Sequence, residues 1–137
     1  MSEQDNVAIV HEAYSNFKTG NIPALLALLS DDVTWQLPQM ENVPFSGQRT
    51  TPAGVGEFFA LLSENEEALQ FEPREMVAQG DKVVSIGYYK WRLTANGREF
   101  DSDFAHVFTI RGGKIVAFQE FTDTAACTNA YAKAMTA

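Results

Sequence analysis

The alternation of apolar and polar residues between Arg98 and Asp123 is the feature that most constrains the fold. In an extended strand, every second side chain points to the same face of a sheet. With this period, one face of the first stretch is rich in aromatic residues and carries Phe100, Ser102, Phe104, His106, Phe108 and Ile110. The next stretch repeats the pattern with Val116, Phe118, Glu120 and Thr122. The pattern predicts two neighbouring strands, each with one ionisable group, His106 or Glu120, on an otherwise apolar face.

Helical patterns come first in the chain and strand patterns follow. Apolar spacing and capping residues predict helices over Val7–Phe17, from Asn21 through Leu29, from Thr51-Pro52 through Leu62, and over Thr124–Met135. Alternation and turn residues predict strands over Val33–Leu37, Leu69–Ala78, Lys82–Thr94, Arg98–Ile110 and Lys114–Thr122. This order predicts a single α+β domain, residues 1–137, in which helices pack on one face of a bent antiparallel sheet.

The lengths of two hairpin loops decide which side chains share a face. A three-residue loop at Arg111–Gly113 makes Glu120 the diagonal neighbour of His106, at roughly 7–8 Å between backbones. A two-residue Gly-Gly turn instead places these two groups on opposite faces. We favour three-residue loops here and at Ala95–Gly97, because they keep the aromatic-rich faces together. The second loop then places Ile86 opposite His106.

Composition excludes several classes of function. The chain has 137 residues and a net charge of −8, which argues against nucleic acids and anionic membranes as partners. The single cysteine, Cys127, excludes an internal disulfide, and one cysteine with two scattered histidines argues against a zinc site. No phosphate-binding glycine motif follows a strand, so we expect no metal and no organic cofactor. The polar start and the lack of a long apolar run lead us to expect a cytoplasmic protein.

Six short segments carry a resemblance to a known family, in the same order along the chain. They are Gly20–Trp35, Phe71–Glu75, Asn96–Asp101, Ala105–Phe108, Gly113–Val116 and Asp123–Ala126. These segments resemble the SnoaL-like, ketosteroid-isomerase-related proteins of the nuclear transport factor 2-like superfamily. The resemblance implies a cone of three helices and a strongly curved sheet around a blind apolar pocket. The family includes isomerases, cyclases, hydrolases, dehydratases and proteins without known activity.

The resemblance does not carry over the catalytic residues of the steroid isomerases. The position of their general-base aspartate is Leu37, and that of their oxyanion-hole tyrosine is Ala13, with Tyr14 one step around. The position of the second oxyanion donor, a protonated carboxylic acid, is His106. Steroid isomerisation by that mechanism is therefore not expected. The acid–base aspartate of SnoaL-type polyketide cyclases falls at or next to Glu120.

His106, Glu120 and Tyr88 are the candidate catalytic residues. A carboxylate beside an imidazole fixes its tautomer and allows proton exchange near neutral pH, and the Tyr88 hydroxyl would polarise a substrate oxygen. The expected pocket wall consists of Tyr14, Phe17, Trp35, Leu37, Phe59, Ile86, Phe104, Phe108 and Phe118. These residues predict binding of a small, largely apolar organic molecule. The accompanying chemistry would be cofactor-free proton transfer, as in isomerisation, cyclisation, dehydration or epoxide opening.

Two alternatives remain open at this level. The same pocket would also serve a ligand-binding protein without chemistry, with His106 and Glu120 only recognising a polar edge. The interior would instead be filled in an interaction protein, so a void of several hundred Å³ favours the first two interpretations. No helix remains to cover the outer sheet face, where we expect an aromatic patch. The resemblance implies a homodimer through that face, and the residues assigned to it are Tyr89, Trp91, Val107 and Phe121.

Overall fold

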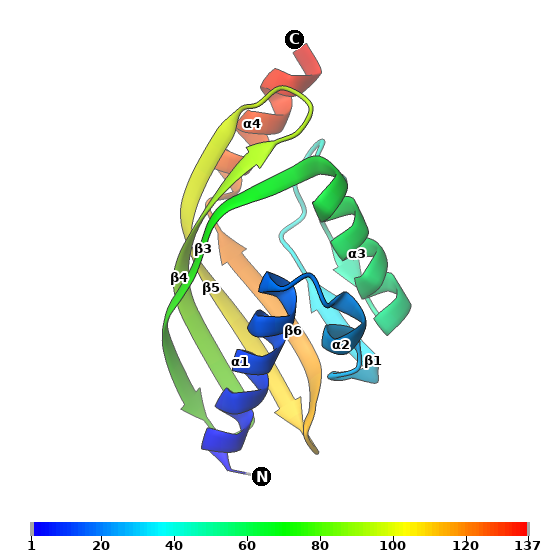
Figure 1. Ribbon diagram of the computed structural model, residues 1–137, viewed down its shortest axis with the longest axis vertical. Coiled ribbons are helices and arrows are strands. Elements are labelled where there is room, and N and C mark those ends of the chain that lie inside the picture. The colour runs from blue at the N-terminus through cyan, green and yellow to red at the C-terminus, as the bar shows by residue number, and fades with distance from the viewer. Residues whose placement is uncertain (1, 137) are drawn as a thin grey trace.

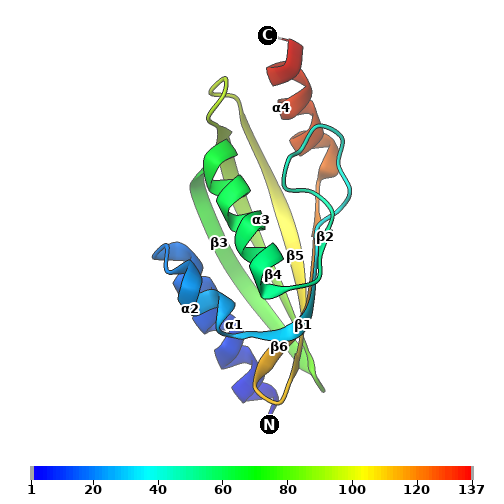
Figure 2. The same ribbon diagram turned by 90° about the vertical axis from the view of Figure 1, so that its right-hand side faces the viewer.

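The computed structural model describes residues 2–136, which form one six-stranded sheet with helices on one side (Figure 1). In chain order the elements are α1 (Glu3–Lys18), α2 (Ile22–Leu26), β1 (Leu29–Gln36), β2 (Gln48–Arg49), α3 (Pro52–Asn65), β3 (Glu66–Gln79), β4 (Lys82–Leu93), β5 (Glu99–Arg111), β6 (Lys114–Thr122) and α4 (Thr124–Thr136). The spatial order is β2-β1-β6-β5-β4-β3, with β1 parallel to β6 and the other neighbours antiparallel. Figure 2 shows α1, α2 and α3 together on the same side of the curved sheet. The predicted α+β fold is confirmed, and the parallel pair and β2 are additions to it.

Capping hydrogen bonds mark the starts of α2 and α3 where the sequence predicts them. Asn21 and Thr51 accept bonds from backbone amides in the first turns of α2 and α3, and a proline occupies the first turn of each helix. Ser2 and Asp5 form a reciprocal capping box that starts α1 a turn earlier than the apolar pattern predicts. None of the helices within residues 2–136 combines the length and apolar character needed to cross a membrane.

The turn between β5 and β6 differs from the predicted three-residue loop. Gly112 and Gly113, both at positive φ, form a two-residue turn. Such a turn alone would put His106 and Glu120 on opposite faces. Val116 is an extra residue in β6, however, and this bulge restores the alternation. His106 consequently pairs directly with Glu120 instead of lying diagonal to it.

The Leu93 amide donates to the carbonyl of Arg98 at 2.8 Å, so the loop between these paired residues has four residues, Thr94–Gly97, where the sequence predicts three. The Gly97 amide donates to the carbonyl of Leu93 at 2.9 Å and closes the turn. One additional loop residue moves every β4 side chain to the other face. Ser85, not Ile86, therefore lies opposite His106.

Gly87 allows the sheet to bend between β3 and β4. A Cβ atom at this position would lie 2.4 Å from the carbonyl oxygen of Glu72 and 2.6 Å from Cζ of Phe104. Nearby, the β3–β4 pairing shifts between Pro73 and Glu75. Because Gly87 has no side chain, the β3 backbone and the Phe104 ring can lie close to it. Aromatic residues of three strands then face the same interior.

Candidate functional site

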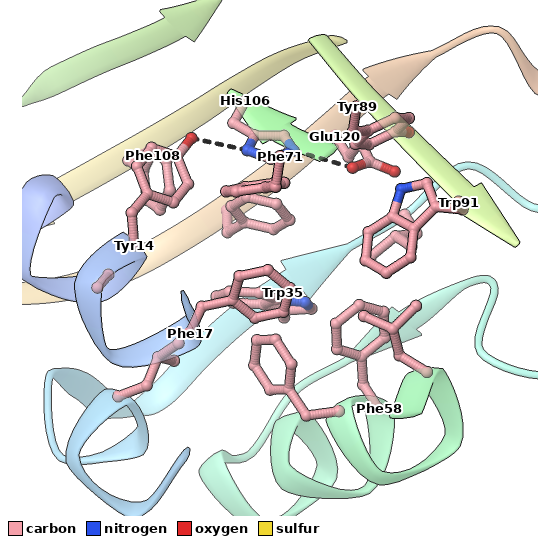
Figure 3. Close-up of a pocket in the computed structure, with 16 residues that line it drawn as sticks. Tyr14, Phe17, Trp35, Phe58, Phe71, Tyr89, Trp91, His106, Phe108 and Glu120 are labelled. Carbon is pink, nitrogen blue, oxygen red and sulfur yellow. Dashed lines mark hydrogen bonds and ion pairs between the residues drawn. The ribbon is translucent and has the colours of Figure 1, made fainter. Parts of the chain in front are cut away.

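Three polar side chains form a hydrogen-bonded chain inside an aromatic interior (Figure 3). The hydroxyl oxygen of Tyr14 lies 2.8 Å from Nδ1 of His106, and Nε2 of His106 lies 2.8 Å from Oε2 of Glu120. Tyr14 comes from α1, His106 from β5 and Glu120 from β6. His106 is 5% exposed. The three hydrogen-bonded side chains thus connect one helix with two strands inside the protein.

The hydrogen-bonding pattern assigns a role to each nitrogen of a neutral His106. Burial raises the pKa of Tyr14; Ser85 opposes this with a smaller lowering effect, and the nearby charge of Glu120 adds a still smaller raising one. The Tyr14 hydroxyl therefore keeps its proton and donates to Nδ1. Nε2 then carries the imidazole proton and donates to the Glu120 carboxylate. Each of the three groups has a complementary partner in this arrangement.

A cavity of about 70 Å³ lies against the hydrogen-bonded side chains of Tyr14, His106 and Glu120. Its wall is almost entirely apolar or aromatic, and comprises Ala13, Tyr14, Phe17, Leu25, Trp35, Leu37, Phe58, Phe59, Leu62, Phe71, Tyr89, Trp91, His106, Phe108, Phe118 and Glu120. A second cavity, of about 40 Å³, shares six of these residues, namely Leu37, Phe58, Leu62, Tyr89, Trp91 and Glu120. Glu120 therefore borders both spaces.

These volumes are smaller than the several hundred Å³ that would favour the two ligand-binding interpretations over a filled interior. They exceed the space of about 10–15 Å³ that a single water needs. Ligand pockets commonly measure about 300–1,000 Å³. An organic molecule of ordinary size thus requires the aromatic side chains of the wall to move apart.

The structure brings most of the predicted site residues together at the cavity. The predicted residues that line it are His106, Glu120, Tyr14, Phe17, Trp35, Leu37, Phe59, Phe108 and Phe118. Phe104 is buried beside them and stacks on the His106 ring, with 4.2 Å between ring centroids.

Tyr88 and Ile86 were predicted to face the pocket, and the structure corrects both assignments. The Tyr88 hydroxyl donates to Oδ2 of Asp101 at 2.9 Å, and the Arg74 guanidinium lies over its ring. Ile86 is 41% exposed. The four-residue loop after β4 explains the error, because it reverses the two faces of that strand. Tyr88 is therefore not available as a catalytic group inside the cavity.

The same reversal places Tyr89 and Trp91 inside, although the sequence predicts them on the outer dimer face. Both line the cavity, and the Tyr89 hydroxyl donates to Oγ1 of Thr122 at 2.5 Å. The sequence shows that Tyr89 and Trp91 alternate with Tyr88. Which of these side chains point inward depends on the length of the following loop, which the sequence leaves open. Val107 and Phe121, by contrast, lie on the outer face as predicted, and Phe121 is 50% exposed.

Glu66 is a further functional candidate that the sequence did not reveal, because it lies between the helix predicted through Leu62 and the strand predicted from Leu69. Glu66 is 5% exposed, lines the second cavity and accepts a hydrogen bond from the Tyr131 hydroxyl at 2.6 Å. Burial raises its pKa from the ordinary 4.5 to about 7. The missed signal is spacing, since Glu66 follows Leu62 by four residues and so continues the buried face of α3 into β3.

No group of three or more histidine, cysteine, aspartate or glutamate side chains within the described part of the chain is arranged to hold a metal ion.

Comparison with known families agrees with the fold. A family model described as a SnoaL-like domain matches residues 10–118. The chain belongs to the SnoaL-like family. No curated protein matched it.

Solved structures similar to this SnoaL-like protein cover nearly its whole length. An NTF2-like protein from Burkholderia xenovorans LB400 is 31% identical, with a TM-score of 0.87 over 96% of this chain and 98% of that chain. An NTF2-like protein of unknown function from Burkholderia pseudomallei K96243 is 27% identical, with a TM-score of 0.83 over 96% and 98%. TerC, co-crystallized with polyporic acid, is 27% identical, with a TM-score of 0.81 over 93% and 98%. These likenesses show that nearly the whole chain shares its fold with solved NTF2-like proteins.

Proposed function

We propose that this SnoaL-like protein binds a small, largely apolar organic molecule in its interior and catalyses cofactor-free proton transfer on it. The observation that carries the proposal is the Tyr14–His106–Glu120 chain, which ends in a carboxylate on an aromatic cavity wall. Burial of an ionisable group costs free energy unless the group is paired, and such groups concentrate at functional sites.

Glu120 is the group that would exchange protons with the substrate. His106 binds one of its oxygens, and Figure 3 shows the other carboxyl oxygen turned toward Trp91. That carboxylate would accept a proton from a carbon next to a carbonyl group and return it to the same carbon or to a conjugated one. No electron leaves the substrate, and the proton count is unchanged at the end. Isomerisation and aldol-type cyclisation both use this step.

His106 and Tyr14 act as positioning residues in this mechanism. The proton on Nε2 of His106 holds the carboxylate in one orientation, and the Tyr14 hydroxyl holds the imidazole in one tautomer. The aromatic wall excludes water from the reacting groups, which strengthens the electrostatic interactions between them. TerC has been co-crystallized with polyporic acid, which supports a small organic ligand for the present protein as well.

Binding of bicyclic probes tests the proposal. Calorimetry would compare naphthalene with 2-naphthol, and NMR would follow the indole N–H signals of Trp35 and Trp91, which are the two tryptophans of the chain and both line the cavity. We expect both probes to shift the indole signals, and 2-naphthol to bind about tenfold tighter through a hydrogen bond to the Glu120 carboxylate. Glu120→Leu should remove this preference, whereas Glu75→Gln, at an exposed position of β3, should not.

Unchanged indole signals with either probe would contradict the proposal. The small cavity volume would then favour the second candidate, an interaction protein with a filled interior and an active outer sheet face.

We also propose that two copies associate through the outer face of the sheet, with a revised set of residues. Its exposed apolar side chains are Val77, Ile86 and Phe121, with Val107 beside them. Three basic side chains of this face form ion pairs with neighbouring carboxylates, Lys90–Glu99, Arg92–Glu67 and Arg74–Glu72. A self-complementary patch with paired charges suits a two-fold contact between identical chains.

Light scattering during size-exclusion chromatography tests the association. We expect a dimer for the wild type and a monomer for Phe121→Glu, because a buried unpaired carboxylate would destabilise the contact. Ala8→Glu, at an exposed position of α1, should remain dimeric. A monomeric wild type at concentrations of about 100 µM, well above the micromolar dissociation constants of weak specific complexes, would contradict the association.

A further inference from the structure

A second buried carboxyl lies outside the Tyr14–His106–Glu120 chain. Glu66, the first residue of β3, is 5% exposed. Its Oε2 accepts a hydrogen bond of 2.6 Å from the hydroxyl of Tyr131, which lies in α4 and is also buried. Within the described residues, this bond occupies one of the two carboxyl oxygens. A carboxyl group in such a place is costly unless its remaining hydrogen-bonding capacity is used.

Glu66 and Glu120 border the same small space. Both line the second cavity, and this cavity shares six of its lining residues with the first. Only side chains therefore separate Glu66 from the space where the proposed reaction takes place. The charge of Glu120 also contributes to raising the pKa of Glu66, after the larger effect of burial, which agrees with their proximity.

The elements that hold the two polar sites approach the interior from different directions. Figure 1 shows α1, which carries Tyr14, at the N-terminal end of the molecule, and α4, which carries Tyr131, at the opposite end. The apolar wall is common to both sites. A ligand that lies along this wall with its reactive end at Glu120 would direct a further substituent toward Glu66.

We infer that Glu66, held by Tyr131, is a second ligand-binding residue of the pocket, and that the natural ligand carries a second oxygen-containing group beyond the one at Glu120. This inference deepens the proposed function and rests on it. A protonated Glu66 donates to a carbonyl oxygen, and an ionised Glu66 accepts from a hydroxyl. The substrate class is accordingly an apolar ring system with two separated carbonyl or hydroxyl groups, and a compound with one such group is a poorer ligand.

Dihydroxynaphthalenes test this inference in the full chain. The 1,3-, 2,6- and 2,7-isomers each add one hydroxyl to 2-naphthol at a different separation. We expect at least one isomer to bind the wild type about tenfold tighter than 2-naphthol does. In Glu66→Leu that advantage should fall to less than twofold, while the affinity for 2-naphthol stays within twofold of the wild type. Glu64→Leu, at an exposed position two residues earlier, is the matched control and should keep the advantage.

The positioning role of Tyr131 has its own readout. Tyr131→Phe removes the hydroxyl that orients Glu66 and leaves the carboxyl in place, so the advantage should shrink but persist. A crystal structure of the wild type with the best isomer should place one ligand oxygen within hydrogen-bonding distance of the Glu66 carboxyl. This second measurement decides the matter if Glu66→Leu does not fold.

Three results would overturn the inference, and they distinguish its own failure from that of the proposed function. If 2-naphthol binds and depends on Glu120 but no second hydroxyl improves binding, the role of Glu66 is wrong and the proposed function stands. The same holds if the advantage survives in Glu66→Leu. If neither naphthalene nor any naphthol binds the wild type, the proposed function fails and this inference fails with it.

Discussion

Glu120 lies directly opposite His106 across β6 and β5, with Oε2 of the carboxyl 2.8 Å from Nε2 of the imidazole. This relationship depends on Val116, since the two-residue turn that precedes it would otherwise send Glu120 to the outer face. The proposed chemistry thus depends on one extra backbone residue in β6. The side chains that carry the chemistry and the bulge that aligns them lie in the same hairpin.

The tautomer of His106 is the first testable consequence. At a pH where the imidazole is neutral, Nε2 should carry the proton and Nδ1 should accept from the Tyr14 hydroxyl. Long-range ¹H–¹⁵N NMR of the imidazole nitrogens distinguishes the two tautomers. His11, which is exposed on α1, serves as an internal reference in the same spectrum. A proton on Nδ1 of neutral His106 would contradict the assigned hydrogen bonds.

Because of Glu66, we expect the folded protein to lose stability as the pH rises. Burial raises its pKa from 4.5 to about 7 in the folded protein, so the folded state retains a proton that the unfolded chain releases. Its stabilising contribution is complete below pH 4.5 and is lost as the pH rises through 7. By linkage, the free energy of unfolding should fall by roughly 3 kcal/mol over this interval because of this residue.

Urea denaturation of wild type and Glu66→Gln between pH 4.5 and 8.5 measures this contribution. The amide does not titrate, so the variant should gain stability relative to the wild type as the pH rises. Glu64→Gln, at an exposed position, should follow the wild-type curve. Parallel curves for the wild type and Glu66→Gln would show that Glu66 does not titrate as described.

Gly87→Ala tests the close approach of β3 to β4. The added methyl group would meet the Glu72 carbonyl oxygen and the Phe104 ring at less than 3 Å. Overpacking of this kind typically costs about 1–3 kcal/mol, and backbone contacts leave little room for relaxation. Thermal and urea denaturation should show a loss in this range. Gly80→Ala is no useful control because Gly80 has a positive φ, but Gly56→Ala, inside α3, should cost less or stabilise.

The alternating patterns predicted the strands, and the capping residues predicted the helix starts, because these signals act over a few neighbouring residues. Face assignments depended on exact loop lengths, which a single residue changes. The alternation at Tyr88, Tyr89 and Trp91 is equally regular in either phase, so only the four-residue loop decides which of them point inward. His106 and Glu120 reached the same face by a turn and a bulge that compensate each other.

The candidate site was predictable only in part. Alternation in two adjacent strands predicted that His106 and Glu120 share a face, although the observed turn and bulge differ from the predicted loop. The bond between Tyr14 and His106 requires the docking angle of α1, and the bond between Tyr131 and Glu66 requires the position of α4. Such contacts between distant segments leave no periodic signal in the chain.

Exchange of the α-protons of 2-tetralone in D₂O is the measurement that tests the proton-transfer proposal most directly. This apolar bicyclic ketone carries acidic protons next to its carbonyl group, and ¹H NMR follows their replacement. The wild type should accelerate exchange above the buffer rate, and Glu120→Gln should lose a factor of about 10² or more, while Glu75→Gln retains the full rate. Exchange at the buffer rate with tetralone bound, or full activity in Glu120→Gln, would contradict the account.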